Sequence, residues 1–418
     1  MTSKKYLLVA VFLMALLVRL YYVIAVPQVS LAGSDAKEYD LIAEGLLEGK
    51  GFPVERLSDN EVEIVRPPLF PLFLAGIYSF FGHNYTVARI IQALLASLLI
   101  FIVYFIAGDI FKDEKVALVS AVMYGLYPSL IGYTGLLYSE TVFIFFLVLT
   151  MFFLERGIDS AKRKYYLLAG LFLGLTTMIS SRSLYLLFFI LAWLLFTQKE
   201  KKKTLKNFLC MSAAMCIVVV PWSIRNYFVS GGKIIPLENY SSATALWLVT
   251  NPQGEILEWS YDKEPLKSLV GNLPINQRTL AIRKEAINNL KRYPWAYVRN
   301  CFKRFFVLFF AGHSNCFYGL EQSTFQALRD GKVFIGTCKL VLLFVNVVVI
   351  IFGFWGMWLF RKSWRSAAAV LIPIVYFVLL HTLYVAAPRL QMPIIPFLLM
   401  FASFAAVRVR DSVVKSLK

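Results

Sequence analysis

The chain has 418 residues, of which 59% are hydrophobic and only 16% are charged, and its mean hydropathy is +0.65. Soluble domains carry roughly 25% charged residues, so this composition excludes a soluble multidomain enzyme, a disordered chain and a disulfide-stapled scaffold. The net charge of +18 would suit a nucleic-acid partner, but its distribution along the chain assigns it to membrane topology, and we expect no nucleic acid. The sequence predicts an all-α polytopic membrane protein.

Ten apolar runs approach the roughly 20 residues that a helix needs to cross a bilayer. Because several are short enough to be tilted or broken, the prediction is about ten spans, within a range of nine to thirteen. The runs are residues 6–26, 85–107, 116–133, 139–155, 165–180, 183–198, 207–222, 336–360, 367–387 and 390–407. Two further stretches, 69–81 and 293–310, are shorter or carry cations, which favours interfacial or re-entrant helices.

Lysine and arginine gather in alternate connections between these runs. They dominate residues 1–5, 108–115, 156–164, 199–206, 361–366 and 408–418, which the positive-inside rule assigns to the cytoplasm. The segment 199–206 (KEKKKTLK) is the densest, and we interpret it as an anchor against anionic membrane lipid. Two large loops, 27–84 and 223–335, then lie outside the membrane, where we expect the chemistry.

This topology divides the chain into three parts. Residues 1–222 form a transmembrane catalytic module that includes the first external loop, 27–84. Residues 223–335 form an external cap of small α or α/β structure, and residues 336–418 supply the C-terminal transmembrane helices and a cytoplasmic tail. The cap carries aromatic side chains that either stack on an acceptor sugar or pack a small core of their own: Trp247, Trp259, Tyr261 and Trp295.

Ionisable residues within the apolar runs fall near one depth, at the external end. Such residues are costly in a membrane and are functional candidates by default. They are Arg19, Arg89, Glu140, Arg182, Lys339, His381 and Arg389. A ring of cations at this level suits an anionic lipid headgroup, above all a phosphate, which arginine binds with its planar fork. The alternative is ordinary snorkelling of long side chains at helix ends.

The first external loop supplies a carboxylate next to this ring. Asp35 follows the first span at or just before the start of a helix, where it is well placed to act as a general base. Further along, Arg66 precedes Pro67 and Pro68, which fix an extended entry into the stretch 69–81 and would hold the arginine at the membrane surface. The alternative for the acidic loop is a solvated surface without chemistry.

Several segments together resemble a known superfamily. They are SDAKEYDLIAEGLLEGKGF, RPPLFPLFLAGIYSFFG, VARIIQALLASLL, YPSLIGYTGLLYSETVF, AGLFLGLTTMISSRSLYLL, PWSIRNY and APRLQMPIIPFLL, in chain order. This ordered set resembles the GT-C glycosyltransferases that use polyprenyl-phosphate sugars. The similarity is to the prokaryotic relatives of protein O-mannosyltransferases and to the lipid A aminoarabinose transferases. It implies a GT-C-like bundle with two external loops.

The resemblance implies roles for individual residues. Asp35 matches the first-loop aspartate that acts as the catalytic base or orients the acceptor. Arg66 matches a basic residue that contacts the donor phosphate, where the aminoarabinose transferases have Lys-Pro-Pro. Arg182 and Arg389 match cationic positions at the turn after the glycine-rich span and before the last span, and we expect both to bind the donor phosphate as well. The predicted sugar- or acceptor-binding residues are Glu38, Tyr39 and Glu140.

The chain departs from the family pattern at three places. The acidic pair often found in the first loop is replaced by Asp35-Ala36, with Glu38 three residues on. Arg182-Ser183-Leu184 replaces a Lys/Arg-x-Pro pattern, and Arg389-Leu390 replaces Arg-Tyr. These departures concern the base and the acceptor pocket rather than the class.

The expected reaction is transfer of a sugar from a polyprenyl-phosphate donor to a hydroxyl of a lipid, glycan or protein acceptor, with inversion at the anomeric carbon. We expect no cofactor and no metal. A divalent metal is the alternative, although Asp35 and Asp40 need not face the same way. We expect the cytoplasmic (inner) membrane of a prokaryote, with the active site facing outside. Rival interpretations are a glycolipid transporter or flippase, a polysaccharide polymerase or ligase, a hydrolase that uses Asp35 with Glu140, and a non-catalytic receptor or assembly factor.

Overall fold

The computed structural model describes residues 2–30, 34–58, 61–64, 66–238, 242–252, 266–271, 273, 275–310, 312 and 314–416. The first half contains α1 (Thr2–Ala25), α2 (Asp35–Leu47), β1 (Glu55–Ser58), β2 (Glu61–Glu63), α3 (Leu69–Phe81), α4 (Tyr85–Phe111), α5 (Glu114–Leu126), α6 (Pro128–Gly132), η1 (Tyr133–Gly135), α7 (Glu140–Ser160), α8 (Arg163–Ile179), η2 (Ser181–Ser183), α9 (Leu186–Thr197) and α10 (Lys201–Val229). The second half contains α11 (Ser242–Thr250), α12 (Leu266–Val270), α13 (Ile275–Arg292), α14 (Pro294–Phe310), η3 (Ser314–Cys316), α15 (Thr324–Arg329), α16 (Val333–Phe360), η4 (Arg361–Ala367), α17 (Ala368–Leu383), η5 (Pro388–Ile394) and α18 (Ile395–Ser416).

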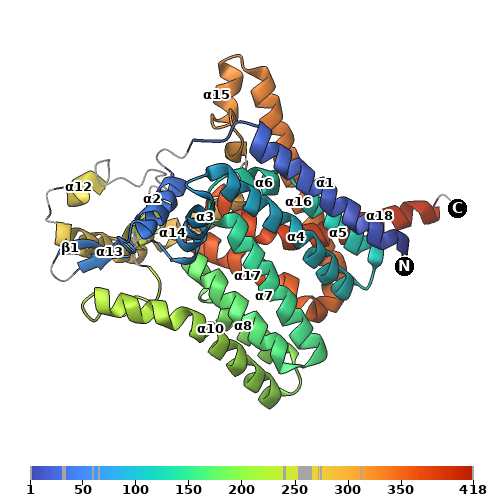
Figure 1. The fold of residues 1–418 in the computed structure, drawn as a ribbon, viewed down its shortest axis with the longest axis horizontal. Helices are drawn as coiled ribbons and strands as arrows, with labels where there is room; N and C mark the ends of the chain where they lie inside the picture. The colour runs from blue at the N-terminus through green and yellow to red at the C-terminus, as the bar shows by residue number, and fades with distance from the viewer. Residues whose placement is uncertain are drawn as a thin grey trace.

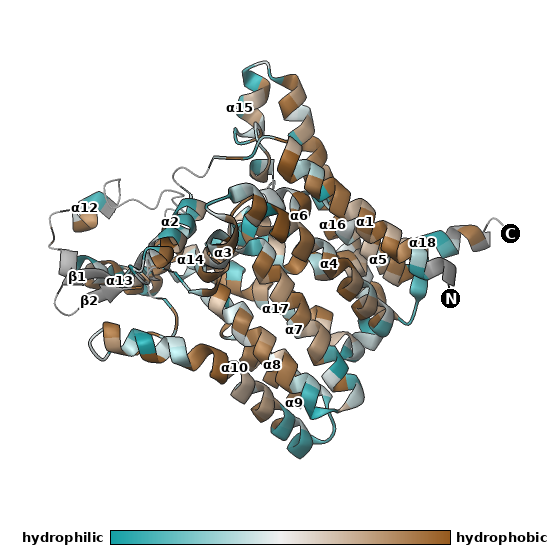
Figure 2. Cartoon of the chain, viewed as in Figure 1, coloured by the Kyte–Doolittle hydropathy of each residue, from teal (hydrophilic) through white to brown (hydrophobic). Residues whose placement is uncertain are grey.

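The chain is an integral membrane protein built as a helical bundle. Its long helices are apolar over most of their length, and hydrophilic residues concentrate at helix ends and in the peripheral segments (Figure 2). The described part of the predicted first external loop (α2, β1, β2, α3) and helices α12 and α13 of the predicted cap gather at the left of Figure 1, whereas both termini lie at the right. The predicted external loops are therefore far from the termini.

Each predicted span coincides with helical structure, but fewer helices meet a strict test of length and hydropathy. Among the described residues, six stretches are long and apolar enough to cross a membrane, or seven if the bent pair α5 and α6 is one span. One of the six, Val333–Leu383, has 51 residues, or about 77 Å at 1.5 Å per residue, which far exceeds a bilayer core of about 30 Å. It contains α16 and α17, joined through η4 with non-helical backbone at Ser363.

The predicted span 116–133 is broken. Helix α5 ends at Leu126, and α6 starts at Pro128 after a bend of 51°. Tyr127 takes an extended conformation, as the residue before a proline prefers. The break frees the carbonyl of Gly125, which accepts a 2.7 Å hydrogen bond from Arg19 Nη1. Arg19 is fully buried at this break, so it joins α1 to α5.

Close contact between α8 and α10 explains the glycine-rich sequence AGLFLGL. A Cβ atom on Gly170 would lie 2.0 Å from the carbonyl oxygen of Met211 on α10, so only glycine allows this approach. Helix α8 leads into η2, which carries Arg182, and α10 leads into the predicted second external loop. Their contact therefore fixes two of the segments that surround the candidate site.

In the described cap, α11 and α13 pack around a small core that includes Trp247, whereas Trp295 on α14 is 81% exposed. Trp247 therefore fits the packing interpretation. Trp259 and Tyr261 lie outside the described residues. Helix α14, which covers the stretch predicted as interfacial, packs on α17 and η5, and its Arg304 is buried with its Nε donating to the carbonyl of Thr382.

Candidate functional site

An ion-pair cluster joins three segments that are distant in sequence. Arg66 Nη2 lies 2.8 Å from Asp35 Oδ1, and Arg389 Nη1 lies 2.5 Å from Asp35 Oδ2. Arg66 also donates through Nε to Glu38 Oε2 at 2.9 Å. The start of α2, the linker before α3 and the start of η5 therefore meet at one carboxylate, whose two oxygens are each held by a different arginine.

Local sequence places these groups. Ser34 is extended and Asp35 opens α2, so Asp35 and Glu38 lie in the first turn, where carboxylates are favoured by the helix dipole. Their spacing of three residues puts both on one helix face, which Arg66 contacts. Pro388 begins η5 and presents Arg389, whose guanidinium lies 5.7 Å from the ring centre of Tyr138.

Glu140, Tyr39 and Arg182 form the wall next to this cluster. Glu140 is buried at the start of α7, and its carboxylate interacts electrostatically with Arg182 and Arg389. The Tyr39 ring lies under Arg66, 5.2 Å from its guanidinium carbon, and its hydroxyl is 3.4 Å from Ser139 Oγ. Arg182 lies in the η2 turn and donates through Nε to Ser180 Oγ at 2.8 Å.

All seven predicted site residues therefore gather, but three other members of the predicted cation ring do not. Arg19 is buried at the α5–α6 break. Arg89 lies beside Tyr85 on α4, 6.0 Å from its ring centre, and Lys339 donates to the carbonyl of Leu320 at 2.7 Å. These three residues were predicted to join the cation ring because they lie at the same predicted depth in the membrane. In the structure their side chains contact residues outside the ion-pair cluster.

The charge state of Asp35 follows from its two arginines. Burial alone would raise the pKa of Asp35, but the charges and hydrogen bonds of Arg389 and Arg66 hold that pKa below its usual range. Asp35 is therefore ionised at neutral pH, and both of its oxygens are paired with arginine side chains. A carboxylate in this state is a weak base as long as the two arginines remain paired with it.

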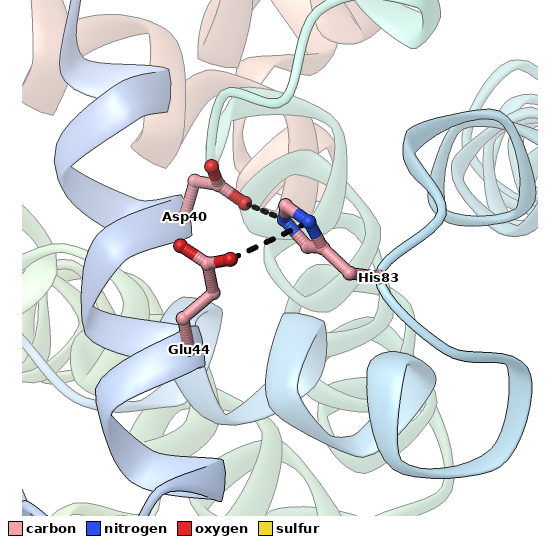
Figure 3. Close-up of side chains that lie close together, drawn as sticks. All are labelled: Asp40, Glu44 and His83. Atoms are coloured by element: carbon pink, nitrogen blue, oxygen red, sulfur yellow. Dashed lines mark hydrogen bonds and ion pairs between the residues drawn. The ribbon is translucent and has the colours of Figure 1, made fainter.

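A second cluster fixes α2 to the bundle. Asp40, on another face of α2, is fully buried and lies within hydrogen-bonding distance of four side chains: Lys37 at 3.2 Å, Tyr78 at 3.1 Å, His83 at 2.7 Å and Tyr85 at 2.7 Å. Figure 3 shows the His83 ring facing the carboxylates of Asp40 and Glu44, and Glu44 Oε1 is 3.4 Å from His83 Nδ1. The cluster therefore ties α2 to the end of α3 and the start of α4.

The same three side chains, Asp40, Glu44 and His83, are close enough together to share a cation. Both Asp40 oxygens already accept hydrogen bonds from other side chains of the protein. The role of the cluster in holding α2 against the bundle is therefore enough to explain why these residues lie together. Asp35 and Glu38 face Arg66 instead, so they do not form one metal-binding cage with Asp40. Whether the protein uses a metal stays a prediction.

The tie predicts a pH-dependent stability. Burial would raise the pKa of Asp40, but hydrogen bonds from His83, Tyr85, Lys37 and Tyr78 hold it below its usual range. Its stabilisation is therefore present above the unfolded-state pKa of about 3.9 and is lost as pH falls through the lower folded-state pKa. We expect Asp40→Asn to lower the thermal unfolding temperature in detergent at pH 7, and the gap to wild type to shrink below about pH 4.

Glu48→Gln, at the exposed end of the same helix, is the matched control and should change little. An Asp40→Asn gap that stays constant from pH 7 to pH 3 would contradict the role of the ionised carboxylate.

One carboxylate of the site was missed by sequence analysis. Glu238 accepts a 2.5 Å hydrogen bond from Ser181 Oγ and interacts electrostatically with Arg66, Arg182 and Asp35. It follows the apolar segment Ile234-Ile235-Pro236-Leu237, and the only sequence signal was its position shortly after the PWSIRNY motif. Glu238 falls within residues 223–335, which the sequence predicts to form an external cap.

Comparisons with known proteins agree with this architecture. The family profile described as dolichyl-phosphate-mannose-protein mannosyltransferase matches residues 65–224. The oligosaccharyltransferase of Archaeoglobus fulgidus, solved with a tethered acceptor peptide, superposes with a TM-score of 0.59 at 15% identity over 99% of this chain and 51% of that one. The chain therefore has the fold of these membrane glycosyltransferases, as the resemblance to GT-C enzymes predicts.

A second solved structure of a membrane glycosyltransferase is similar to this chain to about the same degree. ArnT from Cupriavidus metallidurans, bound to undecaprenyl phosphate, has a TM-score of 0.56 at 15% identity over 97% of this chain and 60% of that one. The chain therefore spans about half to three-fifths of the length of these neighbours. No curated protein sequence matches it.

Proposed function

We propose that this GT-C protein transfers a sugar from a polyprenyl-phosphate donor to an acceptor hydroxyl on the outer face of a prokaryotic cytoplasmic membrane, with inversion. The observation that carries the proposal is the carboxylate of Asp35 held between Arg66 and Arg389, next to Arg182. This arrangement offers both a base for a hydroxyl and cations for a phosphate. Neighbours of the same fold were solved with dolichol-phosphate and with undecaprenyl phosphate, which supports a lipid phosphate as the ligand class.

The ion pairs suggest how donor binding activates the base. A donor phosphate that binds Arg66 and Arg389 competes with Asp35 for them. As the arginines turn to the phosphate, Asp35 loses the cations that hold its pKa down and becomes a better proton acceptor. Donor binding and base activation are then one event.

The chemical step is a single displacement. The acceptor oxygen forms a bond to the anomeric carbon while the bond from that carbon to the phosphate oxygen breaks, and the electron pair stays on the phosphate. The hydroxyl proton passes to Asp35. The three arginines stabilise the negative charge that grows on the phosphate, the kind of interaction that contributes most to catalysis in acyl and phosphoryl transfer. One displacement at one face inverts the anomeric carbon.

The proposal is tested by incubating purified protein with a panel of polyprenyl-phosphate sugars and candidate acceptors, with and without a chelator. Donor-dependent sugar transfer with inverted product is the expected result, and the chelator arm tests the absence of a metal. Lipid flipping in proteoliposomes without sugar transfer would favour the transporter interpretation and overturn the proposal.

A further inference from the structure

The PWSIRNY motif at the end of α10 has a structural task that leads to a new site residue. Trp222 Nε1 donates to the carbonyl of Leu237 at 3.1 Å, and Asn226 Nδ2 donates to the carbonyls of Ile235 at 3.1 Å and Leu237 at 3.0 Å. Ser223 Oγ donates to the carbonyl of Pro236 at 2.8 Å. Three consecutive backbone carbonyls thus accept hydrogen bonds from side chains of one helix. These bonds fix the backbone position of the residue that follows.

That residue is Glu238, and it faces the site. Its side chain reaches across to η2, where Ser181 Oγ lies 2.5 Å from Oε1. Arg182 follows Ser181 directly and interacts electrostatically with the Glu238 carboxyl. Leu237 and Asn226 are almost fully buried, so the backbone before Glu238 is part of the core rather than a loose loop.

Charged and titratable groups around Glu238 come from four other segments of the chain. Arg66 comes from the linker before α3, Arg182 from η2, Asp35 from α2 and Tyr384 from the end of α17. Burial raises the pKa of Glu238, and the Ser181 hydrogen bond and the two arginines offset that effect only in part. The neutral acid is thereby favoured relative to an exposed glutamate.

The formal charges of the site agree with a neutral acid. Arg66, Arg182 and Arg389 are balanced by three carboxylates: Asp35, Glu38 and Glu140. An ionised Glu238 would give this set a net negative charge, which repels a phosphate. A protonated Glu238 leaves the set neutral and adds a hydrogen-bond donor.

We propose that Glu238 binds the phosphate end of the lipid donor as a neutral carboxylic acid, donating a hydrogen bond beside Arg66 and Arg182, and that its ionisation weakens donor binding. This inference rests on the proposed function and assigns a further donor-binding residue to the same site. It also gives the Trp222–Asn226 segment its role, which is to hold the backbone from which Glu238 reaches the donor.

The test measures binding of undecaprenyl phosphate to purified wild type, Glu238→Gln and Glu238→Ala between pH 5.5 and 9. The titration of the probe itself is common to all three proteins, so it cancels in the ratio of their affinities. We expect wild type to lose about tenfold in affinity relative to Glu238→Gln as pH rises, because glutamine cannot ionise and keeps a hydrogen-bond donor. Glu238→Ala should bind about tenfold more weakly than Glu238→Gln at every pH.

Glu321→Gln, an exposed glutamate of the second external loop, is the matched control and should follow wild type. Thermal unfolding of each variant separates misfolding from loss of binding. A wild type to Glu238→Gln ratio that is independent of pH would overturn the role of Glu238 while leaving the proposed function intact. Absence of binding by folded wild type at any pH would instead overturn the proposed function.

Discussion

Protein carrying Asp35→Asn is expected to transfer sugar more than about a hundredfold more slowly than wild type, the usual contribution of a general base. Asparagine keeps the shape of the side chain but accepts no proton. It also no longer neutralises Arg66 and Arg389, so donor binding should be retained or strengthened. The loss should therefore appear in kcat, with the donor KM unchanged or lower, measured by steady-state transfer with the donor varied.

Asp330→Asn provides the matched control, because Asp330 is exposed in the turn after α15. Equal rates for wild type and Asp35→Asn would remove Asp35 as the base. Weaker donor binding together with slower transfer would make it a residue that holds the arginines in place, and the base would have to be sought elsewhere.

Removing the guanidinium of Arg66 should have the second large effect. Arg66→Ala is expected to lower kcat/KM for the donor by about a hundredfold to a thousandfold, the size seen when one group that stabilises developing charge is lost. Its removal also leaves Glu38 without its arginine partner and Asp35 with Arg389 only. Direct binding of a polyprenyl phosphate, measured beside transfer, separates loss of affinity from loss of rate.

Two companion variants sharpen this result. Arg66→Lys keeps the charge but cannot contact Asp35 and Glu38 with a planar fork, so it should fall between wild type and Arg66→Ala. Arg329→Ala, an exposed arginine of α15, should match wild type. Unchanged donor kcat/KM in Arg66→Ala would exclude Arg66 from the phosphate site.

Sequence alone located the residues of the first loop because short-range rules govern them. A helix start brings Asp35 and Glu38 to one face, and Pro67-Pro68 fixes where Arg66 emerges. Membrane depth was less informative, since it supplies only one of three coordinates. Arg19, Arg89 and Lys339 share the predicted level with Arg182 and Arg389, but they contact Gly125, Tyr85 and Leu320, outside the ion-pair cluster.

The sequence did not predict that Glu238 belongs to the site or that His83 contacts Asp40 and Glu44, and the reason is different. Glu238 is placed by hydrogen bonds from side chains of α10 to three consecutive carbonyls, and hydrophobic periodicity carries no information on such bonds. His83 lacks a metal-ligand spacing, and its partners Asp40 and Glu44 lie on a helix some 40 residues earlier. Pro128 is a sequence signal for a helix break. It lies within the continuous apolar run 116–133, however, and the length of that run favours a single span.

Arg19 has a consequence for how the protein is made. It lies on α1, yet its acceptor carbonyl on Gly125 lies 106 residues later in the chain. At synthesis rates of roughly 5–20 residues per second, that partner arrives about 5 to 20 s after the arginine. During this interval the guanidinium must remain in contact with headgroups or water at the end of α1. The packing of α1 around Arg19 is therefore completed only after α5 has been synthesised, although α1 precedes α5 in the chain.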